Sequence, residues 1–343
     1  MLIGREQEKK ELLDALASDY SEFIAVYGRR RVGKTFLIRE TFNYKFTFQH
    51  TGMANTTSKN QLVNFRDSLI EQGAIKVPKL NNWLEAFSEL KRFLNTSTDE
   101  RKLVFIDELP WLDTPKSDFL SALEHFWNGW ATSRRDIVLV VCGSATSWIV
   151  EKIINNHGGL HNRLTKRIKL NPFTLKECET FIESKHISMN RYQLVEAYMV
   201  LGGIPYYWNF LKKGLSVAQN IDRLFFQESG ELQNEFDMLY ASLFRFPEGY
   251  IKIVTALGEK KVGMSRKEII DSTKITDSGT LTRMLKELEW CGFIRKYNNI
   301  GKTIKESIYQ LIDNYTLFYF QFIRKNKLQD EHFWTTSQNS PLY

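Results

Sequence analysis

The stretch Gly28–Thr35 limits the fold of this chain more than any other, because it matches the pattern G-x-x-x-x-G-K-[ST] in full. The mostly apolar residues 22–27 before it are typical of a buried strand, and residues 35–40 after it are compatible with a helix. A glycine-containing turn between a strand and a helix is the setting in which this pattern binds phosphate. The sequence therefore predicts a phosphate-binding loop at the first strand-to-helix turn.

The backbone and side chains of this loop suit a triphosphate and a magnesium ion. Gly28 and Gly33 let the backbone turn tightly with its N–H groups directed at an anion, and the helix N-terminus adds partial positive charge. Lys34 can reach the β- and γ-phosphates, and the Thr35 hydroxyl can bind Mg²⁺. The expected nucleotide contacts are Gly28, Arg29, Arg30, Arg31, Val32, Gly33, Lys34, Thr35 and Phe36.

A second informative stretch is residues 102–108, where four apolar residues run into Asp107 and Glu108. This pattern predicts a buried parallel strand that ends in two acids at its carboxyl edge, where open α/β sheets bind ligands. Asp107 is suited to hold the Mg²⁺ that Thr35 also touches, and Glu108 is suited to orient or deprotonate an attacking water. The alternative is a strand end with two solvated acids.

A third stretch, residues 137–142, is the most strand-like run of the chain, and Gly143-Ser144-Ala145-Thr146 follows it. A polar side chain at this point would lie beside Asp107 and touch the γ-phosphate or the water. Ser144 is the preferred candidate and Thr146 the lesser one. The alternative for Ser144 is an N-cap of a helix at about 148–154.

The order of these elements predicts an α/β fold, with a doubly wound parallel sheet of the P-loop NTPase kind over residues 1–172. A capping box at Thr174–Glu177 begins a helical lid over residues 173–246, which Gly202–Pro205 divides. Residues 247–343 show three helices and a β-hairpin, which is the order of a winged helix, and then a C-terminal helix. Further expected features are a strand at 44–50, a helix at 117–133, a second capping box at Ser265–Glu268, a helix cap at Asp277 or Ser278, and strands at 292–297 and 304–311.

The charge of the chain permits nucleic-acid binding without showing it. The net charge is +7, and the excess is spread over the regions before and after Pro247. The helix expected at 277–290 carries three acids against two bases, a poor balance for a major groove. The hairpin is more basic, through Arg295, Lys296, Lys302 and Lys305. DNA contact therefore stays open, against a structural or protein-docking role.

The sequence also indicates where the chain works. No apolar run approaches the ~18 residues of a membrane span, and the N-terminus is charged almost at once. Cys142, Cys178 and Cys291 lack a C-x-x-C pattern or paired histidines, which argues against a disulfide framework and a zinc site. We expect a cytoplasmic protein without membrane contact.

The three motifs occur in the order Gly28–Thr35, Leu103–Glu108 and Gly143–Ser144, with Ile3–Glu6 at the start. In this the chain resembles the AAA+-related signal-transduction ATPases of the STAND class. It is most similar to the prokaryotic ATP-binding proteins that carry a winged helix after the ATPase core, and the resemblance covers nearly the whole chain. It implies ATP and Mg²⁺ as cofactors. Related chains often continue into a nuclease-like domain, for which the sequence to residue 343 shows no convincing core of paired acids and lysine.

The resemblance also implies roles for residues outside the three motifs. Gly4 and Arg5 would lie near the adenine. The turn Gly203–Pro205 resembles the Gly-x-Pro element of the helical lid, which replaces the usual second sensor arginine. Arg163 is the candidate arginine finger, because a box like His161–Leu164 recurs in the superfamily; the alternative is an ordinary surface arginine. Competing candidates are Arg134, Arg135 and Arg167.

Residues and resemblance together predict a Mg²⁺-dependent ATP-binding protein that hydrolyses ATP and acts as a nucleotide-controlled switch. Lys34 would offset phosphate charge, Glu108 would position water, and Ser144 would sense the γ-phosphate. One alternative is a switch that binds ATP without hydrolysis. Another is a DNA-binding regulator in which ATP binding is secondary and hydrolysis weak or absent. A homo-oligomer or a protein partner is compatible with each.

Overall fold

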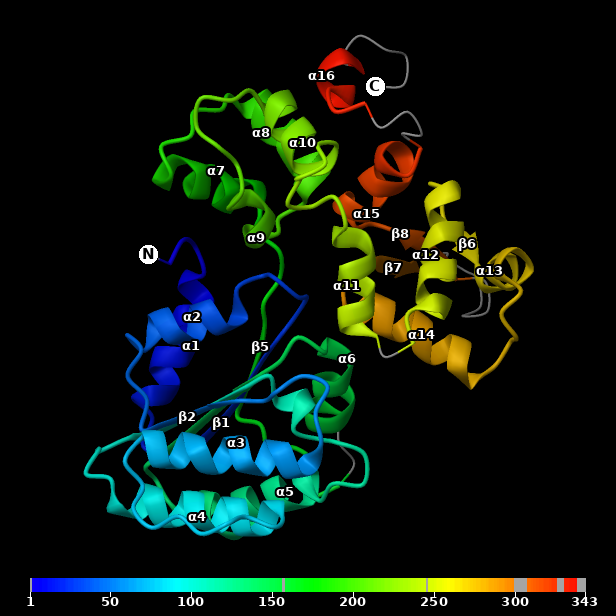
Figure 1. Cartoon of the computed structure of the whole chain (residues 1–343). Coiled ribbons are helices and arrows are strands. Elements are labelled where there is room, and N and C mark those ends of the chain that lie inside the picture. Colours follow the sequence, from blue (N-terminus) through cyan, green and yellow to red (C-terminus); the bar gives the residue numbers. More distant parts are fainter. Residues whose placement is uncertain (1, 156–157, 245, 299–306, 326–329, 338–343) are drawn as a thin grey trace. The chain divides into compact units, whose positions relative to one another are not determined.

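The computed structural model describes residues 2–155, 158–244, 246–298, 307–325 and 330–337 (Figure 1). The chain divides into two compact units: residues 1–28 with 33–170, and residues 29–32 with 171–343. Among the described residues, no helix has both the length and the apolar character that a membrane span requires.

A five-stranded sheet forms the centre of the first unit. Its strands are β1 (Glu22–Tyr27), β2 (Phe48–Thr51), β3 (Lys102–Asp107), β4 (Ile137–Cys142) and β5 (Lys166–Lys169). They lie in the order β2-β3-β4-β1-β5, and every neighbouring pair is parallel. Because β4 lies between β3 and β1, the segments that follow these three strands meet at the carboxyl edge of the sheet. The predicted α/β fold with a parallel sheet is confirmed.

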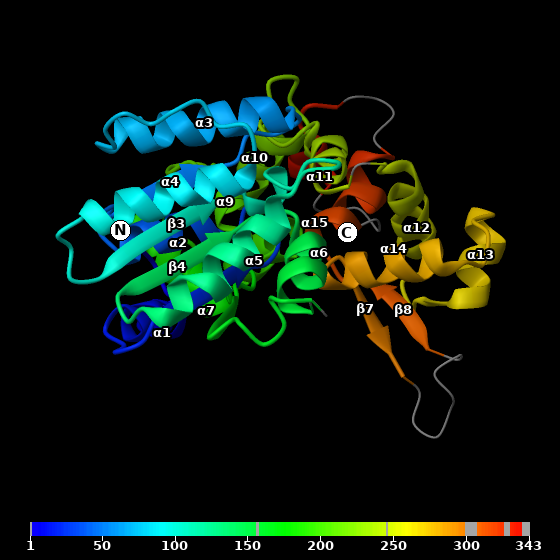
Figure 2. The ribbon, with the colours of Figure 1, turned by 90° about the horizontal axis from the view of Figure 1, so that it is seen from below.

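Helices cover both faces of this sheet. They are α1 (Glu6–Leu16), α2 (Lys34–Thr41), α3 (Ser58–Glu71), α4 (Trp83–Thr96), α5 (Phe119–Gly129) and the short α6 (Thr146–Trp148), which continues as a π-helical turn at Ile149–Ile154. Figures 1 and 2 show α3, α4 and α5 on one side of the strands and α1 and α2 on the other. Strands β3 and β4 are buried along their whole length, as expected for strands covered on both faces.

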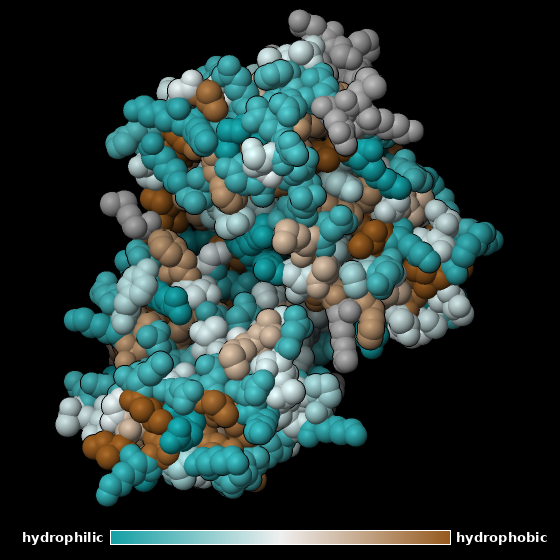
Figure 3. Space-filling model, viewed as in Figure 1, coloured by the Kyte–Doolittle hydropathy of each residue, from teal (hydrophilic) through white to brown (hydrophobic). Residues whose placement is uncertain are grey.

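The core between the sheet and α3–α5 is rich in aromatic side chains. Alternate residues of the strands, such as Val104 and Ile106 of β3, point into it. Phe65 lies 5.3 Å from Phe48 and 5.5 Å from Trp83, ring centre to ring centre. Outside this core, Figure 3 shows hydrophobic groups among hydrophilic ones over α3 and α4. Scattered exposure of this kind is ordinary for a protein surface.

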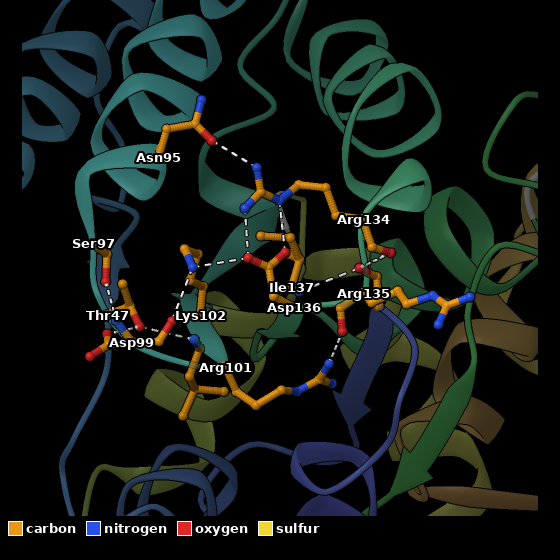
Figure 4. A network of polar contacts seen from close by, with 12 residues as sticks. Thr47, Asn95, Ser97, Asp99, Arg101, Lys102, Arg134, Arg135, Asp136 and Ile137 are labelled. Carbon is orange, nitrogen blue, oxygen red and sulfur yellow. Dashed lines mark hydrogen bonds and ion pairs between the residues drawn. The ribbon is translucent and has the colours of Figure 1, made fainter.

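A polar network connects the amino ends of β3 and β4 (Figure 4). Lys102 Nζ lies 2.9 Å from Asp136 Oδ2, and Arg134 Nη2 donates to the same oxygen at 2.6 Å. Arg134 Nη1 also donates to Asn95 Oδ1 of α4 at 2.8 Å. Hydrogen bonds from Arg134 and Lys102 hold the pKa of the Asp136 carboxyl well below its usual range. The network fixes the two strands at the end opposite to the predicted site.

Two differences from the sequence-based expectations concern the edges of this sheet. The strand expected at 44–50 begins only at Phe48, because Asn43 and Tyr44 have positive φ values and turn the chain. The edge strand β5 was not predicted at all. It pairs with β1 alone, and only Ile168 among its four residues is buried, so that its charged residues conceal the strand pattern. The helix expected at 117–133 is α5, followed by a 3-10 turn at Ala131–Ser133.

The second unit begins with five helices and continues with helices and a small sheet. The helices are α7 (Leu175–Ser184), α8 (Arg191–Leu201), α9 (Pro205–Trp208), α10 (Val217–Phe225), α11 (Glu235–Leu243), α12 (Glu248–Glu259), α13 (Arg266–Thr273), α14 (Gly279–Trp290), α15 (Asn314–Phe318), with a π-helical turn at Tyr319–Ile323, and α16 (Phe333–Ser337). The predicted capping boxes begin α7 at Thr174 and α13 at Ser265. The expected break is present, since α8 ends before Gly202 and α9 begins at Pro205.

The small sheet has the order β6-β8-β7, with β6 (Met264–Ser265), β7 (Ile294–Tyr297) and β8 (Ile308–Leu311), and all its pairs are antiparallel. Helices α12, α13 and α14 followed by β7 and β8 match the predicted elements, whereas the two-residue strand β6 between α12 and α13 was not predicted. Ser278, one of the two expected caps, occupies the N-cap position of α14, but its side chain makes no cap hydrogen bond, and Asp277 accepts from Arg266 instead. Lys302, Lys305 and the first part of the expected strand at 304–311 lie outside the described residues.

Candidate functional site

The loop between β1 and α2 has the backbone that its two glycines permit. Gly28 has a φ of 143°, and a Cβ at this position would lie 2.2 Å from the carbonyl oxygen of Leu170, which directly follows β5. Gly33, with a φ of 90°, precedes the first residue of α2. Both conformations are rare for residues with a side chain. The loop geometry therefore requires glycine at both of these positions of the motif.

The side chain of Lys34 extends back over this loop. It is only 7% exposed, and its Nζ donates a hydrogen bond to the carbonyl oxygen of Gly28 at 2.9 Å. Thr146 Oγ1 donates to the same carbonyl oxygen at 2.8 Å. A positive charge is thus held against the turn where the motif is expected to bind phosphate.

Asp107 ends β3, two strands from the loop in the order of the sheet, and is 5% exposed. Its Oδ1 accepts two hydrogen bonds: from the Glu108 N–H at 2.9 Å and from Cys142 Sγ at 2.8 Å. Burial, together with the neighbouring Asp107 charge, raises the pKa of the Cys142 thiol well above its usual value, so that the sulfur keeps its proton and can donate. Within the described part of the chain, Oδ2 has no hydrogen-bond partner.

Glu108 and Ser144 form a second pair at the same edge. Glu108 has a φ of 50°, and its Oε2 accepts from the Ser144 N–H at 3.1 Å and from Ser144 Oγ at 2.8 Å. The backbone of Glu108 lies close to the segment after β2, since a Cβ on Gly52 would lie 2.6 Å from the Glu108 carbonyl oxygen. Ser144 is not the helix cap that was the alternative: Ala145 precedes α6, and Ser144 binds the carboxylate instead.

Comparison with known proteins assigns this chain to a family. Residues 2–211 match a family described as an ATPase domain predominantly from Archaea. The chain belongs to this ATPase family. Over 330 residues the chain is 28% identical to an uncharacterized protein of Methanocaldococcus jannaschii, covering 95% of this chain and 70% of that one.

Two solved structures support the ATPase fold. The Walker-type ATPase of Pyrococcus abyssi aligns with a TM-score of 0.65 at 17% identity, over 93% of this chain and 96% of that one. The Aeropyrum pernix ORC2 protein, solved in ADPNP–ADP complexes, aligns with a TM-score of 0.50 at 14% identity, over 95% and 94% of the two chains. At these identities the likeness shows a common α/β P-loop NTPase fold.

The remaining predicted site residues of the first unit lie as follows. Thr35 is half-buried in the first turn of α2, and Phe36 beside it is exposed. Gly4 and Arg5 precede α1, where Arg5 is buried and its Nη1 lies 3.8 Å from Glu8 Oε1. Arg163 is exposed in the segment before β5. The roles expected for Gly4, Arg5 and Arg163 stay predictions.

The arginines inside the ATPase motif bind carboxylates of the second unit, to which residues 29–32 belong. Arg29 is buried and forms an ion pair with Asp313, the residue that caps α15, and its guanidinium lies 4.6 Å from the centre of the Phe293 ring. Arg31 forms an ion pair with Glu235. Of the two middle residues, Arg30 is half-buried and Val32 is fully buried. The side chains of Arg29 and Arg31 are therefore engaged with acids in this structure.

Sequence reasoning missed some residues of this candidate site. In the sequence Cys142 stands out only as an isolated cysteine, yet its Sγ donates to Asp107 Oδ1. Its position gave a usable signal, because it is the last residue of a strand that precedes a polar turn. Thr146, the lesser candidate beside Ser144, binds the loop carbonyl of Gly28. The acids Asp313 and Glu235 had no local signal at all, since they lie more than 200 residues from the loop along the chain.

Proposed function

We propose that this chain binds ATP with Mg²⁺, hydrolyses it, and uses the bound state as a switch. The observation that carries the proposal is the arrangement at the carboxyl edge of one sheet. The Lys34 ammonium lies against the glycine turn after β1, and the Asp107 carboxylate ends β3. A cation for phosphate and an acid for the metal are the two fixed parts of a P-loop ATPase site. Membership of the ATPase family supports the same conclusion.

The residues present fit a magnesium ion. Asp107 has one carboxylate oxygen occupied by two donors and the other without a partner among the described residues. A carboxylate oxygen and the Thr35 hydroxyl are the hard oxygen ligands that Mg²⁺ prefers when substrate phosphates and water complete its shell. When bound, the ion would offset the charge that develops on the phosphates.

The protein groups would divide the remaining work. Lys34 would exchange the Gly28 carbonyl for phosphate oxygens, and the loop N–H groups would hold the same charge. Glu108 would orient the attacking water or accept its proton. Ser144 would sense the γ-phosphate, and its two hydrogen bonds to Glu108 would connect that sensing to the placement of the water. Arg163 would act on the phosphate of a second copy, and Gly4 and Arg5 would lie near the adenine.

Two substitutions test the assignment. Lys34→Ala should abolish binding of a fluorescent ATP analogue, whereas Lys45→Ala, an exposed lysine, should bind as the wild type does. Glu108→Gln should bind the analogue but release no phosphate in a single-turnover assay. Full turnover by Glu108→Gln would remove Glu108 from its role. A wild-type protein that binds ATP and releases no phosphate would instead be a switch without hydrolysis.

DNA binding is the second candidate, favoured by the order of α12–α14, β7 and β8 and by the exposed Arg295 on β7. If the module binds DNA, affinity should fall steeply as salt increases, because lysine and arginine contacts to phosphates release counterions. Changing Lys302 and Lys305 together should then weaken binding and reduce the salt dependence. Unchanged affinity in that double variant would refute contact through the hairpin.

A further inference from the structure

Asp107 Oδ1 receives two donors from two different elements. The first is the Glu108 N–H, which belongs to the turn after β3. The second is the thiol of Cys142, the last residue of β4. The strand register explains their closeness: Ile106 pairs with Val141, so that Asp107 and Cys142 are the next residues of two neighbouring parallel strands. The contact is therefore set by the sheet and not by a flexible loop.

This arrangement determines which carboxylate oxygen is available. A carboxylate can rotate broadly about its last side-chain bond, and rotation would exchange the two oxygens at the site. Two donors on Oδ1 oppose that rotation and leave Oδ2 as the oxygen without a partner in the described part of the chain. In metal sites generally, ligating carboxylates are themselves hydrogen-bonded, and loss of such a partner typically costs about 10–100-fold in metal affinity or activity.

We propose that Cys142 is a positioning residue for the Mg²⁺ of this site: its thiol donates to Asp107 Oδ1 and thereby directs Oδ2 to the metal. The inference rests on the proposed function, because it needs a metal and a nucleotide at this edge of the sheet. Cys142 itself touches neither of them.

The competing explanation is that Cys142 is only a small apolar residue filling the core. It is fully buried between β3 and β1, which fits such a role. The two explanations predict opposite orders for two substitutions. If Cys142 only fills the core, Cys142→Ala, which stays apolar, should be tolerated better than Cys142→Ser, which buries a hydroxyl. If Cys142 positions Asp107, Cys142→Ser, which keeps a hydrogen-bond donor, should be tolerated better than Cys142→Ala, which has none.

The experiment measures how much a metal improves nucleotide binding to the full chain. A fluorescent ATP analogue is titrated once with Mn²⁺, as the probe for Mg²⁺, and once in EDTA. The dissociation constant in EDTA divided by that with Mn²⁺ gives the metal ratio, which is compared between variants. In Cys142→Ala the ratio should fall about 10-fold with the EDTA affinity unchanged, and Cys142→Ser should stay within about 3-fold of the wild type. Asp107→Asn should lose the metal effect, and Cys178→Ala, at a buried cysteine of α7, should keep it.

Several results would overturn the inference. A wild-type ratio in Cys142→Ala, or a loss in Cys142→Ser as large as in Cys142→Ala, shows that the donor does not matter. Equal losses with Mn²⁺ and in EDTA show a general packing defect. All of these leave the proposed function standing, whereas a wild-type protein that binds no ATP under either condition refutes the nucleotide site and the inference together.

Discussion

His50 should make the first unit sensitive to mild acid. It lies in β2, is 2% exposed, and its ring centre is 4.9 Å from that of Phe65. Ser68 Oγ donates to the Asn64 carbonyl oxygen at 3.0 Å, so it accepts a hydrogen bond from His50 Nδ1, 2.9 Å away. Nε2 is buried and has no partner among the described residues. A second proton would therefore be buried and unsatisfied, and burial lowers the pKa of His50 to about 3.

The size of the effect follows from this shift. An unfolded histidine has a pKa of about 6.5, so as the pH falls the unfolded chain takes up the proton first. The contribution of His50 to stability is complete above about pH 6.5 and is lost progressively down to about pH 3. The slope approaches about 1.4 kcal/mol per pH unit, and the loss between pH 7 and pH 5 is about 2 kcal/mol.

The perturbation is His50→Asn, which keeps an N–H for Ser68 but does not titrate near neutral pH. The opening free energy of the first unit is measured at pH 7, 6 and 5 by hydrogen exchange of the peptides that cover β2 and β3. The variant should be less stable than the wild type at pH 7, because the ring no longer packs on Phe65. Its loss from pH 7 to pH 5 should be about 2 kcal/mol smaller than that of the wild type.

The control is His125→Asn, at an exposed histidine of α5, which should leave the pH dependence unchanged. Parallel pH profiles for wild type and His50→Asn would refute the reasoning, because they would mean that the buried ring accepts a proton in the folded protein as easily as in the unfolded one. A profile changed equally by His125→Asn would refute it as well.

Two further predictions concern the loop and the opposite end of the sheet. Gly28→Ala should cost about 1–3 kcal/mol in a urea titration and abolish binding of the ATP analogue, because its Cβ would lie 2.2 Å from the Leu170 carbonyl oxygen; unchanged binding would show that the loop can move away from β5. Asp136→Asn should cost about 1–3 kcal/mol at pH 7 through weakened bonds to Arg134 and Lys102. Because the folded pKa of Asp136 is depressed, its contribution is present above pH ~4 and lost below it, so wild type and Asp136→Asn should converge in stability at lower pH.

The strands that form the site were predictable because they are buried on both faces. The runs that became β1, β3 and β4 are nearly continuous in apolar residues, and that pattern survives any tertiary context. The edge strand β5 was not predictable from the sequence, because a strand with one neighbour can carry charged residues such as Lys166, Arg167 and Lys169. The turn at Asn43 and Tyr44 has only a weak signal, because asparagine adopts positive φ more readily than most residues but tyrosine does not.

Within the site, the sequence predicted which residues follow the strands but not which of them touch. The hydrogen bond between Ser144 and Glu108, for example, was not predicted. Such pairings depend on the strand order, which places β4 between β3 and β1 and cannot be read from spacing along the chain. The partners of Arg29 and Arg31 illustrate the same limit, since long-range ion pairs have no local pattern.

The carbonyl of Gly28 accepts from both Lys34 and Thr146, and this shared acceptor bears on how nucleotide exchange would proceed. If an incoming triphosphate draws the lysine away, the threonine remains on the same oxygen and holds the turn in place. The turn would then keep the hydrogen bond from Thr146 while Lys34 turns to the phosphates, and each hydrogen bond exchanged in this way changes the free energy by about 1 kcal/mol. If the chain binds and hydrolyses ATP as proposed, the turn held by Thr146 would keep its shape when the product leaves and would be ready for the next nucleotide.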